Sequence, residues 1–215
     1  MRAYSADLLL STLGRGGYAS WMALRAGEEL TAGLHRTPLL TVAETREALD
    51  ADREAHGIYG WWLINPEALP EVPTTRHPSE PVGLLYVGIG PGSTNSKRNL
   101  RARFRDHARD TGRSTLRRVL ASLLYEREGW RPVWTDRPVL SDLDNDALSA
   151  WMAANLRVQW VSVAEPWTVE AEVIRMIRPP LNRTHNRTHP FYQRVGDARK
   201  RFREAAEVSR GIEDE

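Results

Sequence analysis

The chain has 215 residues and a formal net charge of +2 at pH 7, with 30 basic residues against 28 acidic ones. It contains no cysteine, which excludes disulfide bonds and cysteine-based zinc sites. No stretch approaches the roughly 18 apolar residues that a membrane span requires, and the run Leu8-Leu9-Leu10 is too short and too poorly flanked for a signal peptide. We therefore expect a cytoplasmic protein that has no membrane partner and is large enough to bury a core.

Residues 1–56 are predicted to form a helical N-terminal extension without a motif of known chemistry. Apolar residues recur at helical spacing over residues 18–30. A second helix is expected over residues 41–55, where Thr41 can cap the first turn and Glu44 stands three residues later, the pattern of a capping box. We interpret this region as a cap or small accessory subdomain.

Two short apolar stretches, residues 57–64 and 84–88, are rich in aromatic and β-branched residues and are bounded by glycine and proline. Both are typical of β-strands. A third strand is predicted over residues 157–164. Residues 65–82 contain five prolines, which predicts a loop without regular structure, either an insertion or a flap that faces the substrate. The expected fold is α/β, with a small antiparallel sheet of three strands flanked by helices.

A strongly basic helix is predicted over residues 99–109. Leu100 and Phe104, four positions apart, form its buried stripe. Arg103 and His107 have the same spacing and flank that stripe, so they point towards the same neighbouring element. A guanidinium in such a place can hold a phosphate oxygen and stays charged at all relevant pH values.

Two packing helices and a C-terminal helix are also expected later in the chain. Residues 114–126 and 142–155 carry apolar faces and are interpreted as packing helices, with an irregular segment over residues 127–140 between them. Residues 191–215 contain a basic C-terminal helix that offers a second surface for phosphates.

Basic residues cluster around the predicted helix that carries Arg103. Nine of them lie between Lys97 and Arg118, against only Asp106 and Asp110. Local clustering attracts a polyanion more effectively than net charge does, although a solvated helix face has the same pattern. The residues expected to contact nucleic acid are Lys97, Arg98, Arg101, Arg105 and Arg109.

Several of these elements, in this order, resemble the GIY-YIG nuclease family. Gly57-Ile58-Tyr59 matches the first signature and Tyr86-Val87-Gly88 the second, with valine in place of isoleucine. The basic helix follows, and a glutamate-bearing helix then runs into Pro179-Pro180-Leu181-Asn182. The resemblance covers residues 57–190. One departure is Ile89, which stands where many members carry a lysine.

The resemblance places the family glutamate on Glu170, counted back from the closing motif. Glu172 is the rival, but residues two apart on a helix are separated by about 200° and face different ways. A repeated tetrapeptide leaves Asn186 as an alternative to Asn182, and the preceding Pro-Pro-Leu favours Asn182.

The function that the resemblance implies is a divalent-metal-dependent endonuclease that hydrolyses phosphodiester bonds in DNA, including structured or single-stranded DNA. Glu170 would hold Mg²⁺ or Mn²⁺ through oxygen, Arg103 would stabilise the phosphate, and His107 would assist it or relay a proton. Tyr59 would help to deprotonate the attacking water and Tyr86 would orient water or phosphate, an assignment that the two tyrosines could also exchange. The phenol pKa is ordinarily about 10, so this role requires nearby cations to lower it.

Two other classes of protein have the same features. One is a nucleic-acid-binding module that has the same fold and does not cleave, for which the missing lysine is the only support. The other is a structural or interaction protein in which these tyrosines and arginines only pack.

Overall fold

The computed structural model of the protein describes residues 22 and 24–213. A helical segment covers residues 24–34. The later helices are α2 (Val42–Ala51), α3 (Leu100–Arg109), α4 (Thr115–Glu128), α5 (Asp142–Asn155), α6 (Glu170–Ile177) and α7 (Tyr192–Glu213). The strands are β1 (Gly57–Leu63), β2 (Thr75–Arg76), β3 (Gly83–Gly90), β4 (Pro132–Trp134), β5 (Pro138–Leu140) and β6 (Leu156–Ser162), and two 3₁₀ turns are η1 (Pro66–Ala68) and η2 (Pro166–Thr168). The part of the first expected helix that precedes residue 22 lies outside the described residues.

The main sheet is antiparallel with the strand order β2-β3-β1-β6. The prediction of three strands is therefore wrong, because β2 adds a fourth at the edge. This strand consists of Thr75 and Arg76, which pair with Leu84 and Gly83. Two residues within a proline-rich loop are too few for a periodic signal. All residues of β1, the strand between β3 and β6, are buried.

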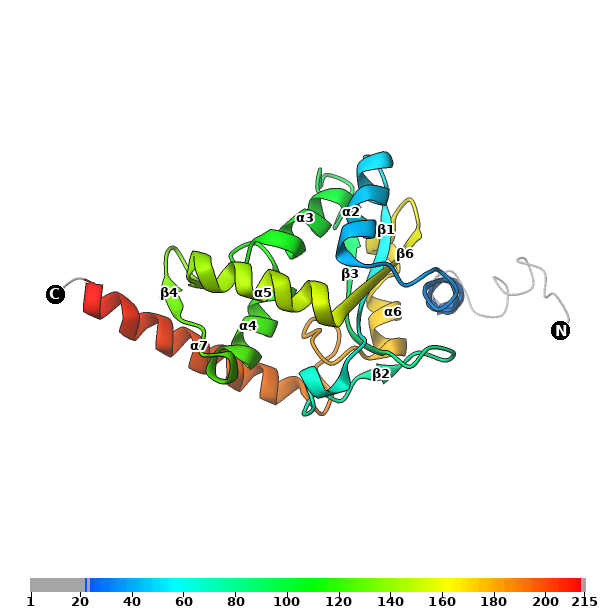
Figure 1. Cartoon of the computed structure of the whole chain (residues 1–215). Helices are drawn as coiled ribbons and strands as arrows, with labels where there is room; N and C mark the ends of the chain where they lie inside the picture. Colours follow the sequence, from blue (N-terminus) through cyan, green and yellow to red (C-terminus); the bar gives the residue numbers. More distant parts are fainter. Residues whose placement is uncertain (1–21, 23, 214–215) are drawn as a thin grey trace, which may run out of the picture.

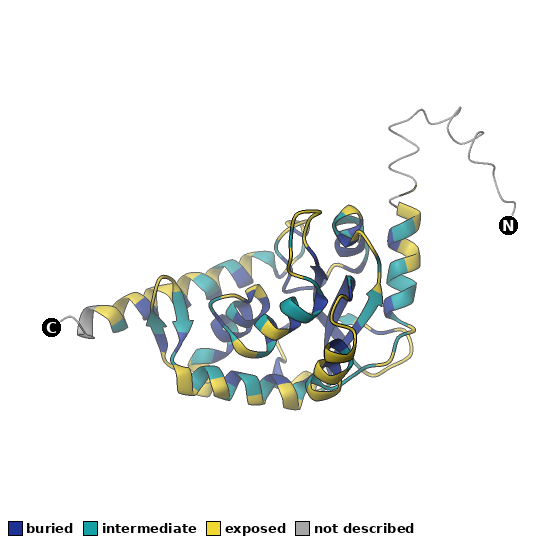
Figure 2. Cartoon of the chain, turned by 90° about the horizontal axis from the view of Figure 1, so that it is seen from above, coloured by how far each residue is buried: buried dark blue, intermediate teal, exposed yellow. Residues whose placement is uncertain are grey.

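Side chains of β1 alternate between two separate cores, as the pleat requires. Tyr59, Trp61 and Leu63 pack with residues of α2, α3, α4, α5 and α7. Ile58 and Trp62 pack with residues of α6 and with the end of the helix at 24–34. The helices α3, α4 and α5 therefore cover one face of the sheet and α6 lies against the other (Figure 1). Buried residues are concentrated in the strands between these layers (Figure 2).

A β-bulge in β3 turns a tyrosine towards α3. The register with β1 skips Leu85, and both Leu85 and Tyr86 pack in the core that contains Tyr59. Leu84 and Val87, on either side, pack in the other core. Bulges commonly re-aim a side chain in this way. As a result Tyr59 and Tyr86 face the same helical layer.

Two glycines are required where β3 meets its neighbours. A Cβ atom at Gly88 would lie 2.3 Å from the Tyr59 hydroxyl oxygen. A Cβ atom at Gly90 would lie 2.6 Å from the backbone nitrogen of Leu100. Gly88 thus makes room for the Tyr59 ring, and Gly90 allows α3 to begin directly against the end of β3.

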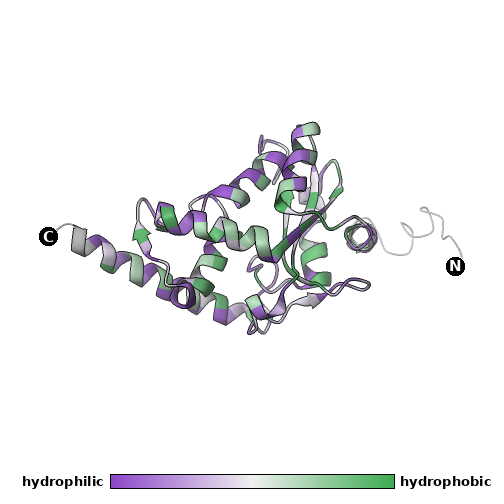
Figure 3. Cartoon of the chain, in the orientation of Figure 1, coloured by the Kyte–Doolittle hydropathy of each residue, from purple (hydrophilic) through white to green (hydrophobic). Residues whose placement is uncertain are grey.

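Residues 127–140 are more regular than expected. After α4 ends they form an antiparallel hairpin of β4 and β5, in which Pro132 and Pro138 occupy the first position of each strand. Proline is tolerated there because a first residue need not donate to the ladder. The hairpin and α4 both pack against α7, whose polar and apolar residues alternate along its length (Figure 3).

Helix caps in the structure agree with the local sequence. Thr41 accepts a hydrogen bond from the backbone of Glu44, and the Glu44 carboxylate accepts from the Thr41 backbone, so the predicted capping box is confirmed. Asn99 caps α3 by accepting from the backbone nitrogen of Ala102 at 3.0 Å. Among the described residues, no helix has both the length and the apolar character needed to cross a membrane.

Candidate active site

A chain of short hydrogen bonds links β1, α3 and α4. The hydroxyl of Tyr59 lies 2.5 Å from Nε2 of His107, and Nδ1 of His107 lies 2.6 Å from Oγ of Ser114. Ser114 also caps α4 by accepting from the backbone nitrogen of Arg117. Both nitrogens of the imidazole are therefore occupied, and the ring is held in one orientation.

The imidazole of His107 is neutral at neutral pH. Burial, together with the positive charges of Arg103, Arg117 and Arg98, lowers its pKa to about 3. Its ring also contacts Trp61 edge-on, with centroids 5.9 Å apart. A buried neutral imidazole between two hydroxyl groups can accept a proton at one nitrogen and donate one at the other.

Both tyrosines are buried phenols with raised pKa values. Burial raises the pKa of Tyr86 to about 12 and that of Tyr59 well above its ordinary value. The charge of Arg103 lowers both values, but its effect is smaller than that of burial. The Tyr86 ring also contacts His107, with centroids 5.8 Å apart. In the free protein neither phenol is ionised at neutral pH, so the pKa that a phenolate base would require is not reached.

Arg103 lies where α3 meets the end of β3. Its Nε donates to the carbonyl of Ile89 at 3.2 Å, which leaves the outer nitrogens of the guanidinium for other acceptors. Its charge affects the pKa of Tyr59, Tyr86 and Glu170. Arg103 is thus the cation common to these groups.

Glu170 opens α6 and is half-buried. Burial raises the pKa of its carboxyl group, while His185 and Arg103 act in the opposite direction. Within the described part of the chain its carboxylate forms no hydrogen bond or ion pair. Although α3 and α6 pack in different cores, Arg103 and Glu170 are close enough for their charges to interact.

Glu172 has a different environment. It pairs with Arg175 on the same helix, and its Cβ lies 3.2 Å from the point that a Cβ at Gly27 would occupy. It therefore faces the helix at 24–34, away from the tyrosines. The two glutamates differ in direction as helical geometry requires.

Asn182 supports the strand that carries Tyr86. Its Oδ1 accepts from the backbone nitrogen of Val87 and its Nδ2 donates to the carbonyl of Val87, both at 2.8 Å. The backbone nitrogen of Leu181 also donates to the backbone carbonyl of Leu85. These bonds give hydrogen-bond partners to the backbone groups of β3 that the short strand β2 does not reach. Both polar atoms of the buried Asn182 side chain bond to the backbone of Val87, so this side chain can position the neighbouring Tyr86.

Three of the five basic residues predicted to contact nucleic acid line one hollow of about 700 Å³ beside α3, namely Arg98, Arg105 and Arg109. Arg98 pairs with Asp106 in that hollow and lies close enough to Tyr59 to affect its pKa. Arg101 instead pairs with Asp50 of α2 at 2.6 Å, and Lys97 is exposed in the loop before α3.

One member of the basic cluster is not available to any ligand. Arg117 is fully buried, donates to the carbonyls of His107 and Asn145, and has a pKa that burial lowers to about 10. It holds α4 and α5 together, so the predicted surface of nine cations is smaller than the sequence indicates.

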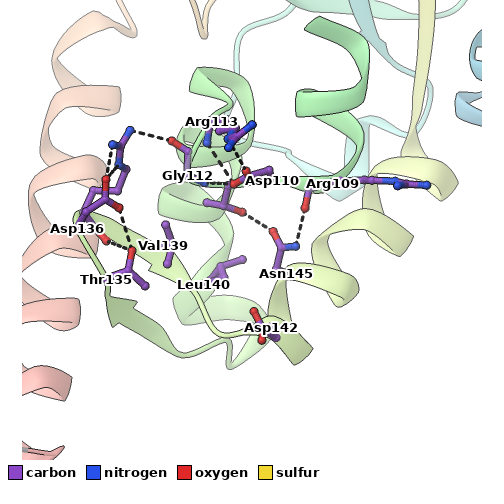
Figure 4. Close-up of a pocket in the computed structure, with 12 residues that line it drawn as sticks. Arg109, Asp110, Gly112, Arg113, Thr135, Asp136, Val139, Leu140, Asp142 and Asn145 are labelled. Atoms are coloured by element: carbon purple, nitrogen blue, oxygen red, sulfur yellow. Dashed lines mark hydrogen bonds and ion pairs between the residues drawn. The ribbon is translucent and has the colours of Figure 1, made fainter. Parts of the chain in front are cut away.

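A separate hollow of about 580 Å³ lies beyond the end of α3 (Figure 4). Arg113 pairs there with Asp110 at 3.4 Å, and Arg137 pairs with Asp136. Because the cations are neutralised locally, this hollow is a poor site for an anion. It also does not include the tyrosines or Glu170.

Glu170 fits a divalent cation as a single carboxylate ligand. No group of three or more histidine, aspartate or glutamate residues is arranged to hold a metal within residues 22 and 24–213. The carboxylate of Glu170 is a hard oxygen donor, half-buried and without a partner in this part of the chain. Mg²⁺ is commonly bound by one or two carboxylates and otherwise by water and substrate phosphate.

Sequence reasoning missed two residues beside this site. Ser114 was recognisable as the start of a helix, but its bond to His107 depends on how α3 packs against α4. Arg118 was counted only in the basic cluster, whereas its charge lowers the pKa of Tyr86. Neither contact has a signature in local sequence.

The fold and the site together define an α/β protein with an antiparallel sheet in which two tyrosines, a histidine, an arginine and a glutamate gather beside the central strands. A family model described as GIY-YIG catalytic domain matches residues 57–201, about two-thirds of the chain. The chain belongs to the GIY-YIG nuclease family, which confirms the resemblance and indicates nuclease activity. Comparisons with curated proteins and with solved structures found no significant match.

Proposed function

We propose that the protein is a divalent-metal-dependent endonuclease that hydrolyses phosphodiester bonds in DNA. The observation that carries this proposal is the half-buried carboxylate of Glu170, which has no partner among the described residues and lies within reach of the charge of Arg103. An ionised carboxylate in such a place is costly unless a cation joins it. A bound cation beside a free guanidinium suits the charge that develops on a phosphate during hydrolysis.

Glu170 would hold the metal ion, Mg²⁺ or Mn²⁺. When bound, such an ion supplies Lewis-acid polarisation of the phosphate and lowers the pKa of water. Arg103 would bind a non-bridging phosphate oxygen with the nitrogens that Ile89 does not use. The loss of a lysine at Ile89 thus leaves Arg103, with Arg98 nearby, as the source of positive charge from the chain.

Tyr59 would act as a proton relay rather than as a phenolate. In the tautomer that carries its proton on Nδ1, His107 donates to Ser114 and accepts from the Tyr59 hydroxyl at Nε2. As water attacks phosphorus, the bond to the leaving sugar oxygen breaks and that oxygen takes a proton from solvent. The proton of the attacking water passes to the Tyr59 oxygen while the phenol proton passes to Nε2 of His107. The negative charge of the bound phosphate would stabilise the imidazolium that forms, because in the free protein the pKa of His107 is only about 3. Tyr86 would orient the water or the phosphate. This scheme accommodates the raised pKa of Tyr59, because the phenol never has to ionise.

The test is cleavage of nucleic acids by the purified full chain. Supercoiled plasmid, single-stranded DNA, branched DNA and RNA are each incubated with Mg²⁺, Mn²⁺ or a chelator. We expect metal-dependent nicking of DNA and none with the chelator. Binding without cleavage under every condition would favour a non-cleaving module on the same fold, and cleavage of RNA alone would contradict the choice of DNA.

A further inference from the structure

A second cationic hollow lies between the loop that follows α6 and the beginning of α7. Its volume is about 760 Å³. The charged and aromatic residues that line it are Arg175, Arg183, His185, Arg187, Tyr192 and Arg199, and two threonines complete the wall. No acidic residue contributes to the lining. The loop connects α6 to α7 and lies close to α6 (Figure 1).

Most of this positive charge is not neutralised by the protein. Arg175 pairs with Glu172. In contrast, the side chains of Arg183, Arg187 and Arg199 form no ion pair with any residue in the described part of the chain. The guanidinium of Arg183 lies over the Tyr192 ring, 4.4 Å from its centroid, and its Nε is buried without a hydrogen-bond partner.

Arg199 is a partly buried cation of this hollow. Burial lowers its pKa, and the charges of Arg118 and Arg183 lower it further. Arg199 and Arg183, which repel one another, gain from a shared anion, because each would then have a charge-assisted hydrogen bond. The hollow beyond the end of α3 differs, since Arg113 and Arg137 are paired with aspartates there.

The hollow adjoins the proposed active site from two directions. His185, in its wall, affects the pKa of Glu170. Arg118, which lies close to Arg199, affects the pKa of Tyr86. The hollow therefore lies close to Glu170, and a polyanion bound in it would lie beside this carboxylate.

We propose that this hollow binds the backbone phosphates of the nucleic-acid strand that flanks the cleaved bond. The inference rests on the proposed function, because it places the strand by reference to Glu170. Phosphates are favoured over bases as the occupant, since Arg183 already covers one face of Tyr192, the aromatic residue in the lining of the hollow. The threonine hydroxyls supply neutral donors for the same oxygens.

The experiment compares duplex DNA binding by the full chain in a chelator, across a range of salt concentrations, for Arg187→Gln, Arg199→Gln and the control Arg203→Gln. Arg203 also lies on α7, is exposed, pairs with Glu207 and does not line the hollow. Arg187→Gln and Arg199→Gln should each lower the slope of the logarithm of the binding constant against the logarithm of salt concentration by about 0.9. Each should also weaken DNA binding roughly fivefold near 0.15 M salt. The control should leave both unchanged.

Equal effects of all three variants would overturn the proposal, as would no effect of Arg187→Gln and Arg199→Gln. Inorganic phosphate provides a further arm: stabilisation of the wild type against heat by phosphate, without any difference in DNA binding among the variants, would identify an isolated anion site and contradict a strand path. Arg187 is exposed, so its variant should fold normally. Plasmid nicking by the wild type, measured in parallel, tests the proposed function separately, because the hollow can bind DNA whether or not Glu170 supports cleavage.

Discussion

The hydroxyl of Tyr59 and Nε2 of His107 lie 2.5 Å apart, although 48 residues separate them in the chain. Three features produce this contact. Tyr59 and His107 face one core, Gly88 leaves room for the tyrosine ring, and Ser114 fixes the other side of the imidazole. The pair gives the first signature tyrosine a proton acceptor within a buried environment.

Replacing Tyr59 with phenylalanine should remove the relay and keep the fold. Positioned proton transfer typically contributes 10²- to 10⁴-fold, so we expect the cleavage rate to fall by about 100-fold or more. Tyr86→Phe, which keeps the Tyr59–His107 bond, should reduce the rate less. The measurement is the rate of plasmid nicking by each variant, and circular dichroism checks that each variant is folded. A normal cleavage rate in Tyr59→Phe together with a severe loss in Tyr86→Phe would show that Tyr86 relays the proton and Tyr59 does not.

His107 should make the folded protein sensitive to acid. Its pKa is about 3 in the folded protein against an ordinary 6.5, so the unfolded chain takes up a proton first as the pH falls. This contribution to stability is complete above pH 6.5 and is lost towards pH 3, by at most about 1.4 kcal/mol for each pH unit.

The measurement is the free energy of unfolding in urea at a series of pH values for the wild type and His107→Gln. The other histidines with lowered pKa values, His35, His77 and His189, are present in both proteins. The difference between the two curves therefore isolates His107. We expect the variant to lose less stability between pH 6.5 and pH 3. Parallel curves would mean that His107 titrates normally.

Much of the fold was predictable because its signals are local. The strands β1, β3 and β6 are rich in aromatic and β-branched residues, and Thr41 and Asn99 mark helix starts by their capping chemistry. The short strands β2, β4 and β5 were not predictable, because pairing and packing decide their conformation over two or three residues. The segment of the hairpin was expected to be irregular, yet Pro132 and Pro138 each begin a strand.

The site was predictable in composition but not in detail. Helical geometry separated Glu170 from Glu172, and the structure gives the two carboxylates different surroundings. The tyrosine environment could not be foreseen, since the bulge at Leu85 and the burial of both phenols arise from packing. Nor did the sequence distinguish an exposed arginine from Arg117, which is buried between helices.

Asn182 should contribute to cleavage indirectly, by stabilising the fold around Tyr86. Asn182→Ala leaves the backbone nitrogen and carbonyl of Val87 without partners, and a buried unsatisfied group costs about 1–3 kcal/mol. Urea unfolding should show a loss of this size, with reduced cleavage as a consequence of the displaced Tyr86. Asn182→Ala with full stability and no cleavage would instead assign the residue a direct role with the substrate.

Affinity for DNA should fall steeply with salt, in part through the hollow beside α3. The double variant Arg105→Gln with Arg109→Gln should lower the logarithmic salt slope by about 1.8, because each arginine neutralises one phosphate. Arg101→Gln is the matched control, since Arg101 is paired with Asp50. Fluorescence anisotropy across a salt series measures both slopes. Binding that does not change with salt would make the cluster a solvated helix face.

The central claim is that Glu170 holds a catalytic metal ion, and Glu170→Gln tests it most directly. Glutamine has nearly the same shape but lacks the charge that a hard cation requires. Because burial disfavours the ionised carboxylate, the variant should be at least as stable as the wild type in a chelator above the raised pKa of Glu170. Glu172→Gln, on the same helix but paired with Arg175, is the control.

Plasmid cleavage in Mg²⁺ or Mn²⁺ should be abolished in Glu170→Gln and retained in Glu172→Gln. DNA binding should be preserved in Glu170→Gln and at least as strong in Glu172→Gln, because the second change frees Arg175 in the hollow between α6 and α7. Cleavage at the wild-type rate by Glu170→Gln would contradict the account, because no metal ligand would then lie at this position.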